Sequence, residues 1–132
     1  MSTPSESRLR EHPDQRFAGL IHHVDLNEAV ERLRHEPVRL THGHRQVALY
    51  HHGSLTVALF QFNPDGGLEK HVADAAVIIH VLEGTISVKT AESTTTLTSG
   101  QMLMLPPGVP HDLKAPHPAL VLLTVCLGHT PT

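Results

Sequence analysis

The feature that most constrains this chain is a succession of short apolar runs in which hydrophobic residues recur at every second position. That period indicates β-strands with one buried face, and the turn-forming residues between the runs mark the strand ends. Only an antiparallel sandwich or small barrel buries so many half-apolar strands in so short a chain, so the sequence predicts an all-β fold. The expected strands, about eight in number, cover residues 46–50, 55–62, 76–82, 85–90, 93–98, 101–105, a short piece after His111, and 119–127.

One segment before these strands has a helical period. Asp25 and Glu28 have the spacing of a helix capping box, and Pro37 follows as a stop signal. We expect one short amphipathic helix over about residues 26–35. Its apolar face would consist of Leu26, Ala29, Val30 and Leu33.

The length of 132 residues fits one domain, because domains commonly have roughly 100–200 residues. Residues 1–16 are polar and have no apolar period, so we expect a poorly ordered arm there. Residues 17–132 would then form the single domain.

Charge and hydropathy exclude two classes of partner. The formal net charge of -3 gives no basic surface for binding phosphates, so nucleic acid is not an expected partner. No apolar run approaches the roughly 18 residues that span a bilayer, and the first residues do not resemble a signal peptide. We therefore expect a cytoplasmic protein without a membrane partner.

The chain has 13 histidines, which invites a search for a metal site. The pair His42 and His44 could share one face of an extended segment, whereas His51 and His52 fall in a predicted hairpin turn, where adjacent side chains point apart. Neither pair is interpreted as a site. We expect four scattered histidines on the surface, namely His12, His35, His117 and His129.

The longest apolar runs are interpreted as core. The scarcity of aromatic residues means that Val, Leu and Ile must supply most of the core, with Met102 to Leu105 filling irregular space within it. The single cysteine, Cys126, lies in such a run and is interpreted as a small buried hydrophobe.

The stretch Gly100-x5-Pro106-x-Gly108-x2-His111 resembles the second motif of the cupin family in every position up to the histidine. The family often has Asn four residues later, where this chain has Ala115. The proline and glycine fix a tight turn, which would aim His111 into the barrel.

The upstream stretch 81-VLEG-84 is similar to the glycine end of the first cupin motif, a His-x-His pair followed by Glu and then Gly. Counting back from Gly84 places Val77 at the Glu position, Ala73 at the second histidine and His71 at the first. Of the family's four ligand positions, this chain keeps His71 and His111.

The resemblance covers about residues 45–127 and implies a cupin jelly-roll barrel, also called a double-stranded β-helix, with one short N-terminal helix. In the family, three imidazoles and a carboxylate suit Fe, Mn, Ni, Cu or Zn. In an alternative register, Glu69-x-His71 occupies the His-x-His place, and Glu69 would supply a carboxylate. The candidate ligands of a divalent metal (Fe, Mn, Ni or Zn) are therefore His71, His111 and Glu69.

Two further side chains stay open as ligands. Asp74 could reach the site, although Asp is a common turn former. His80 is one residue out of phase with Val77 and Val81, so it would point away from the lumen unless a bulge shifts the strand.

The expected function rests on the resemblance to cupins and on the loss of two of the family's four ligand positions. We expect a small cupin-domain protein that binds a small-molecule ligand in the barrel lumen, with or without a divalent metal, in a non-catalytic or sensing role. The alternative is a metal-dependent enzyme of the dioxygenase or isomerase type, acting on a small organic acid or sugar-like substrate. A third interpretation fills the lumen with side chains. The resemblance also implies a homodimer, for which strand 46–50 and the preceding helix could supply the contact.

Overall fold

The computed structural model describes residues 21–35, 43–71 and 74–128. Within them lie one helix and nine strands. Their bounds are α3 (Leu26–His35), β1 (His44–His52), β2 (Leu55–Phe62), β3 (Gly66–His71), β4 (Ala75–Glu83), β5 (Thr85–Lys89), β6 (Thr94–Thr98), β7 (Met102–Leu105), β8 (His111–Ala115) and β9 (Ala119–Leu127).

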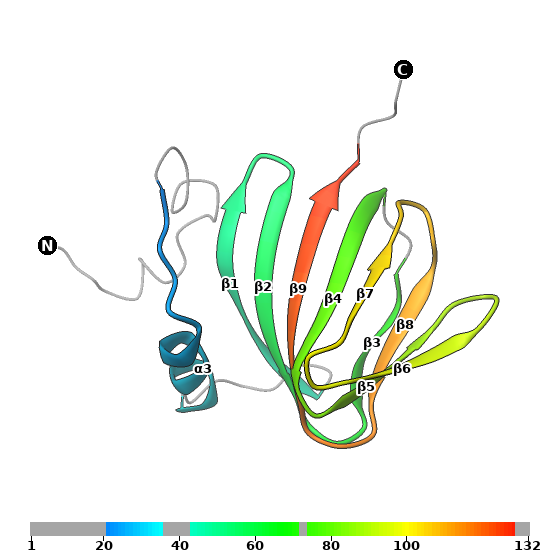
Figure 1. Ribbon diagram of the computed structural model, residues 1–132, viewed down its shortest axis with the longest axis horizontal. Coiled ribbons are helices and arrows are strands. Elements are labelled where there is room, and N and C mark those ends of the chain that lie inside the picture. Colours follow the sequence, from blue (N-terminus) through cyan, green and yellow to red (C-terminus); the bar gives the residue numbers. More distant parts are fainter. Residues whose placement is uncertain (1–20, 36–42, 72–73, 129–132) are drawn as a thin grey trace, which may run out of the picture.

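The strands form two antiparallel sheets, with the strand orders β1-β2-β9-β4-β7 and β3-β8-β5-β6. Figure 1 shows the sheets meeting where β8 turns into β9 and opening toward the other end, where β7 turns into β8. The expected all-β jelly roll is confirmed, and in the described residues a short helix precedes its first strand.

The core lies between the sheets and follows the alternation of each strand. On β4, Val77, Ile79 and Val81 are buried, and the side chains between them are partly exposed. Each such apolar side chain contributes roughly 1.5–3 kcal/mol on full burial. Two of the few aromatic residues, Phe60 and Phe62, also lie in this core. Their rings stack with centroids 5.7 Å apart.

Helix α3 packs on the outer face of the larger sheet. Its first turn is capped by the Asp25 carboxylate, which accepts hydrogen bonds from the Asn27 and Glu28 amides at 3.0 and 3.3 Å. Leu33 is its buried anchor, whereas Leu26, expected on the same face, is 37% exposed. No helix in the described part of the chain has the length and apolar character that crossing a bilayer requires.

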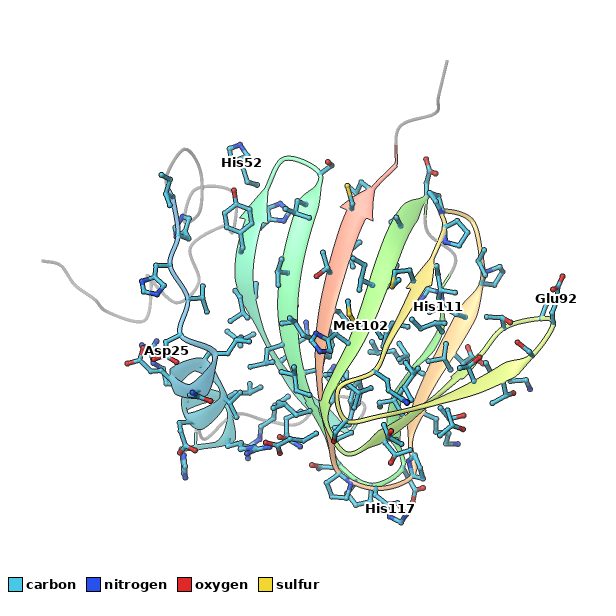
Figure 2. The ribbon with its side chains drawn as sticks, in the orientation of Figure 1. Asp25, His52, Glu92, Met102, His111 and His117 are labelled. Carbon is cyan, nitrogen blue, oxygen red and sulfur yellow. The ribbon has the colours of Figure 1, made fainter. Side chains whose placement is uncertain are left out.

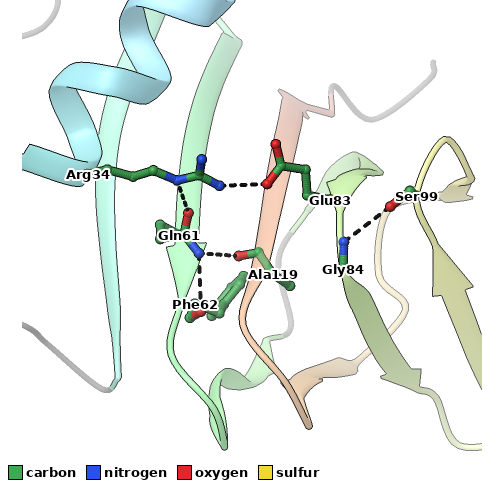
Figure 3. A network of polar contacts seen from close by, with 7 residues as sticks. All are labelled: Arg34, Gln61, Phe62, Glu83, Gly84, Ser99 and Ala119. Atoms are coloured by element: carbon green, nitrogen blue, oxygen red, sulfur yellow. Dashed lines mark hydrogen bonds and ion pairs between the residues drawn. The ribbon is translucent and has the colours of Figure 1, made fainter.

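A polar network joins the helix to the sheet beneath it (Figure 3). Arg34 donates to the Gln61 side-chain oxygen at 2.8 Å and to the Glu83 carboxylate at 2.7 Å. Gln61 in turn donates to the main-chain oxygen of Ala119 at 3.2 Å. The Arg45 guanidinium also donates to the carbonyls of Leu33 and Arg34, which satisfies acceptors at the helix end.

The strand bounds correct the sequence prediction in two places. Strand β1 runs to His52, so His51 and His52 belong to the strand and the turn is confined to residues 53–54. Strand β3 was not among the predicted strands, because Gly66 and Gly67 remove the apolar alternation from its first half.

Two apolar runs that the sequence assigned to the core have side chains on the outer face of the larger sheet, on β7 and β9. Met102 and Met104 are 47% and 62% exposed, because their positions on β7 alternate with those of Leu103 and Leu105, which face the core. Cys126 is likewise exposed, since it pairs in register with Ala76 on the outer face of β9. These three side chains were predicted to be buried and are not.

Candidate functional site

His111 is the first residue of β8, at the end of the molecule where the sheets open (Figures 1 and 2). The turn before it contains Gly108 at φ 86°, a left-handed conformation that favours glycine, as the sequence predicted. His111 is 7% exposed and lies in phase with the buried Leu113 and Ala115. The turn therefore directs the imidazole toward the interior.

A local hydrogen bond orients the His111 ring. Its Nδ1 lies 3.0 Å from the main-chain oxygen of Val109. A carbonyl oxygen can only accept, so Nδ1 carries the proton and a neutral imidazole has its lone pair on Nε2. This is the tautomer that serves as a hydrogen-bond acceptor or metal ligand through Nε2.

A cavity of about 250 Å³ lies beside this histidine. Its volume is below the roughly 300–1,000 Å³ typical of pockets for drug-sized ligands, so it suits a smaller molecule. The lining residues come from the end of β5 and the start of β8, namely Lys89, Thr90, Ala91, Pro110, His111 and Asp112.

Two opposite charges stand next to each other at this cavity. Lys89 and Asp112 are cross-strand partners of β5 and β8, and Lys89 is exposed. The Asp112 Oδ1 atom is buried and has no hydrogen-bond partner. A buried acceptor without a partner costs about 1–3 kcal/mol, so this wall of the cavity is polar and incompletely satisfied.

Sequence reasoning missed Lys89, Thr90 and Asp112 as site residues. Lys89 and Thr90 are distant from Asp112 along the chain and meet it only because β5 pairs with β8. The one available signal was the position of Asp112 directly after His111.

The backbone brings two predicted ligands together. His71 is the Cα partner of His111 across β3 and β8, as a shared site requires. A register shift lies between Leu68 and His71, which is where Glu69 falls. The side chains of Glu69 and His71 lie outside the described part of the structure, so their role as ligands stays a prediction.

The two open alternatives are placed as follows. Strand β4 keeps its register from Ala75 to Val81, so no bulge turns His80 inward, and His80 lies on the outer face. Asp74 is an exposed bend residue whose carbonyl accepts a hydrogen bond from the Gly128 amide at 2.6 Å. Among the described side chains, no three His, Cys, Asp or Glu residues gather into a metal-binding group.

The other described histidines have separate environments. His44 is 4% exposed, packs against Phe60 and Phe62, and donates from Nε2 to the Gln46 side-chain oxygen at 2.8 Å. It is a core histidine. His35 and His117 are exposed, as expected, whereas His12, His42 and His129 lie outside the described residues.

The chain matches the profile of a known protein family. The sequence profile of the family described as "AraC-like ligand binding domain" matches residues 52–125. That segment contains β2 to β8, most of β9 and every residue that lines the cavity. No curated protein sequence matches the chain.

Solved structures share the fold at low sequence identity. An RmlC-like cupin from Shewanella frigidimarina NCIMB 400 superposes with a TM-score of 0.64 at 20% identity, over 69% of this chain and 82% of that one. KdgF from Halomonas sp. gives a TM-score of 0.64 at 18% identity, over 73% and 89%. A cupin-2 domain containing protein, also from S. frigidimarina NCIMB 400, gives 0.61 at 17% identity, over 76% and 91%.

Proposed function

Because the chain belongs to the family of AraC-like ligand binding domains, which are cupin-type domains, we propose that it binds a small molecule at the mouth of the barrel lumen, beside His111. The observation that carries the proposal is the cavity that His111 shares with Lys89 and Asp112. A buried imidazole of fixed tautomer, a cation and a carboxylate with a buried, unpartnered oxygen all border this cavity, and a few polar groups at a pocket orient a ligand in it.

A binding or sensing role has more support than a catalytic one. Val77 stands where the cupin motif has its Glu, and in this structure it is a buried member of the apolar core. The wall that would carry a metal-binding carboxylate in the family is therefore apolar here. Such a wall favours holding a ligand by shape and a few hydrogen bonds.

Binding can be tested with a panel of small carboxylic acids, hydroxy acids and monosaccharides, detected by ligand-observed NMR. For any compound that binds, we expect His111→Gln to lower the affinity on the order of tenfold, which corresponds to one lost hydrogen bond of about 1.4 kcal/mol. The matched control is His117→Gln, because His117 is exposed in the turn at the opposite end of the sheets (Figure 2). Equal affinity in both variants would contradict a ligand site at His111.

We further propose that His71, His111 and Glu69 hold a divalent metal (Fe, Mn, Ni or Zn). It is supported by the register that pairs His71 with His111 and by the fixed Nδ1–H of His111. Glu69 would supply the negative charge that two neutral imidazoles lack.

The metal proposal has a direct measurement. Protein purified without a histidine tag should contain stoichiometric metal, and His71→Ala and His111→Ala should each lose it. Glu69→Gln tests the carboxylate, since unchanged metal affinity would remove Glu69 from the site. Protein that takes up none of the four metals after incubation would end the metal proposal and leave the ligand proposal standing.

The same pairing of His71 with His111 supports the second candidate function, a metal-dependent enzyme of the dioxygenase or isomerase type. A metal there would act as a Lewis acid on a small organic acid or sugar-like substrate. This chain's part would be to orient the substrate through Lys89 and Asp112. Turnover of a bound compound that is lost in His71→Ala would favour the enzyme over the sensor.

We further propose a homodimer, formed through β1 and α3. Strand β1 is an end strand of the larger sheet, and an end strand offers unpaired main-chain groups to a second copy. Sedimentation equilibrium should give twice the chain mass, and a monomer mass would refute the dimer.

A cytoplasmic location and the lack of a nucleic-acid partner stay predictions from the sequence.

A further inference from the structure

The outer face of β4 and β7 brings together three side chains that the ligand site does not use. His80 on β4 is the Cα partner of Met102 on β7, and Met104 pairs with Ile78 one step along the same face. The barrel core lies on the opposite side of both strands, where Val77 and Ile79 point. This face is therefore separate from the cavity beside His111.

The three donors are within reach of one ion. Directly opposed residues of an antiparallel pair have Cβ atoms about 4.5–5.5 Å apart, and diagonal neighbours about 7–8 Å. His80 is thus adjacent to Met102 and diagonal to Met104. Each methionine has three rotatable side-chain bonds, so both thioether sulfurs can turn toward the imidazole.

The exposure of the methionines and the state of the imidazole distinguish this group from ordinary core residues. Methionine normally fills space in cores, yet Met102 and Met104 are 47% and 62% exposed. The His80 imidazole is partly buried, and no hydrogen bond or ion pair engages it within the described residues. A partly buried imidazole without a hydrogen-bond partner is stabilised by a ligand that binds its lone pair.

The chemistry of the donors selects the ion. Thioether sulfur is a soft ligand that favours Cu(I), and imidazole binds copper as well. All three donors are neutral, and the neighbours Ile78, Leu122 and Thr124 carry no charge, so nothing nearby would compensate a divalent cation. We propose that His80, Met102 and Met104 form a surface site for a soft monovalent cation, namely Cu(I), for which Ag(I) is a redox-inert substitute.

NMR of the methionine methyl groups tests the site in the full chain. Cys126→Ser is used as the background, because an exposed thiol would itself bind the metal. One equivalent of Ag(I) should shift the methyl signals of Met102 and Met104 and leave that of Met1 unchanged, which makes the only other methionine an internal control. Equal shifts at Met1 would show adventitious thioether binding and overturn the proposal.

Affinity measurements with Cu(I), made without oxygen against a chromophoric chelator, complete the test. The double variant M102L/M104L keeps the apolar volume and removes both sulfurs, and it should weaken binding on the order of 10–100-fold or more. His80→Gln should also weaken binding, whereas the exposed His52→Gln should not. Unchanged Cu(I) affinity in M102L/M104L or in His80→Gln would overturn the site.

Discussion

At the scale of single residues, the turn at Gly84 has no room for one added methyl group. Gly84 has φ 91°, and a Cβ placed there would stand 2.4 Å from the Pro118 main-chain oxygen and 2.9 Å from the Ala119 Cα. Backbone atoms cannot move aside as a flexible side chain can. Gly84 is therefore needed both for its conformation and for the close approach of the β8–β9 connection.

We predict that Gly84→Ala lowers the free energy of unfolding by about 2–5 kcal/mol, the sum of a left-handed backbone cost and a clash. Gly100→Ala is the matched control, because Gly100 has a similar φ of 85° and nothing within 4 Å of an added Cβ. The control should cost only about 1–2 kcal/mol. Urea unfolding measures both, and equal losses would show that the approach to Pro118 does not matter.

At the scale of elements, helix α3 is held by one buried side chain and by several polar contacts at its end. Leu33 is 2% exposed and clusters with the buried Leu59 and Leu120. The pair Arg34–Glu83 has side chains that are 35% and 61% exposed, so water screens it. The apolar contact should dominate the docking of the helix.

We predict that Leu33→Ala costs about 2–5 kcal/mol, the range for a large-to-small change in a core. Arg34→Ala should cost at most about 1 kcal/mol, as exposed ion pairs do. Hydrogen exchange of the helix amides, read beside urea unfolding, would show loss of protection over Leu26–His35 in the first variant alone. A larger effect of Arg34→Ala would mean that the network of Figure 3 holds the helix.

The elements also show how far sequence reasoning reaches. Strands bounded by turn formers, such as Leu55–Phe62 and Ala119–Leu127, were predicted to the residue. Strand β3 was missed because its pairing with β8 is a long-range contact that two glycines hide from the local pattern. The burial of Met102 was predicted wrongly, since an apolar run does not reveal which face of its strand is covered.

At the scale of the whole molecule, the sequence predicted positions in the candidate site only where a motif sets a turn. The inward position of His111 was predicted from the spacing of its glycine and proline residues, which set the turn locally. Lys89 and Asp112 were not found, because only the pairing of β5 with β8 brings them to one cavity. Local spacing therefore predicts a side chain that a turn positions, and it does not predict neighbours that a sheet assembles.

The order of strands in the larger sheet makes the end of the chain indispensable. Strand β9 lies between β2 and β4 and pairs with both along nearly its whole length. Without it, β2 and β4 lose their shared partner, and the core loses Val121 and Leu123. The sheet would be divided into two separate pairs of strands, β1–β2 and β4–β7, and an isolated pair is marginally stable at best.

We predict that a chain ending at residue 118 does not fold, whereas a chain of residues 17–132 unfolds cooperatively with the stability of the full chain. The second expectation rests on the polar, aperiodic character of residues 1–16. Circular dichroism during urea unfolding, with dispersion of the amide NMR signals, measures both. A cooperative transition in the 1–118 chain would mean that β9 is added to a sheet that already exists. Loss of stability in the 17–132 chain would mean that the first residues belong to the folded unit.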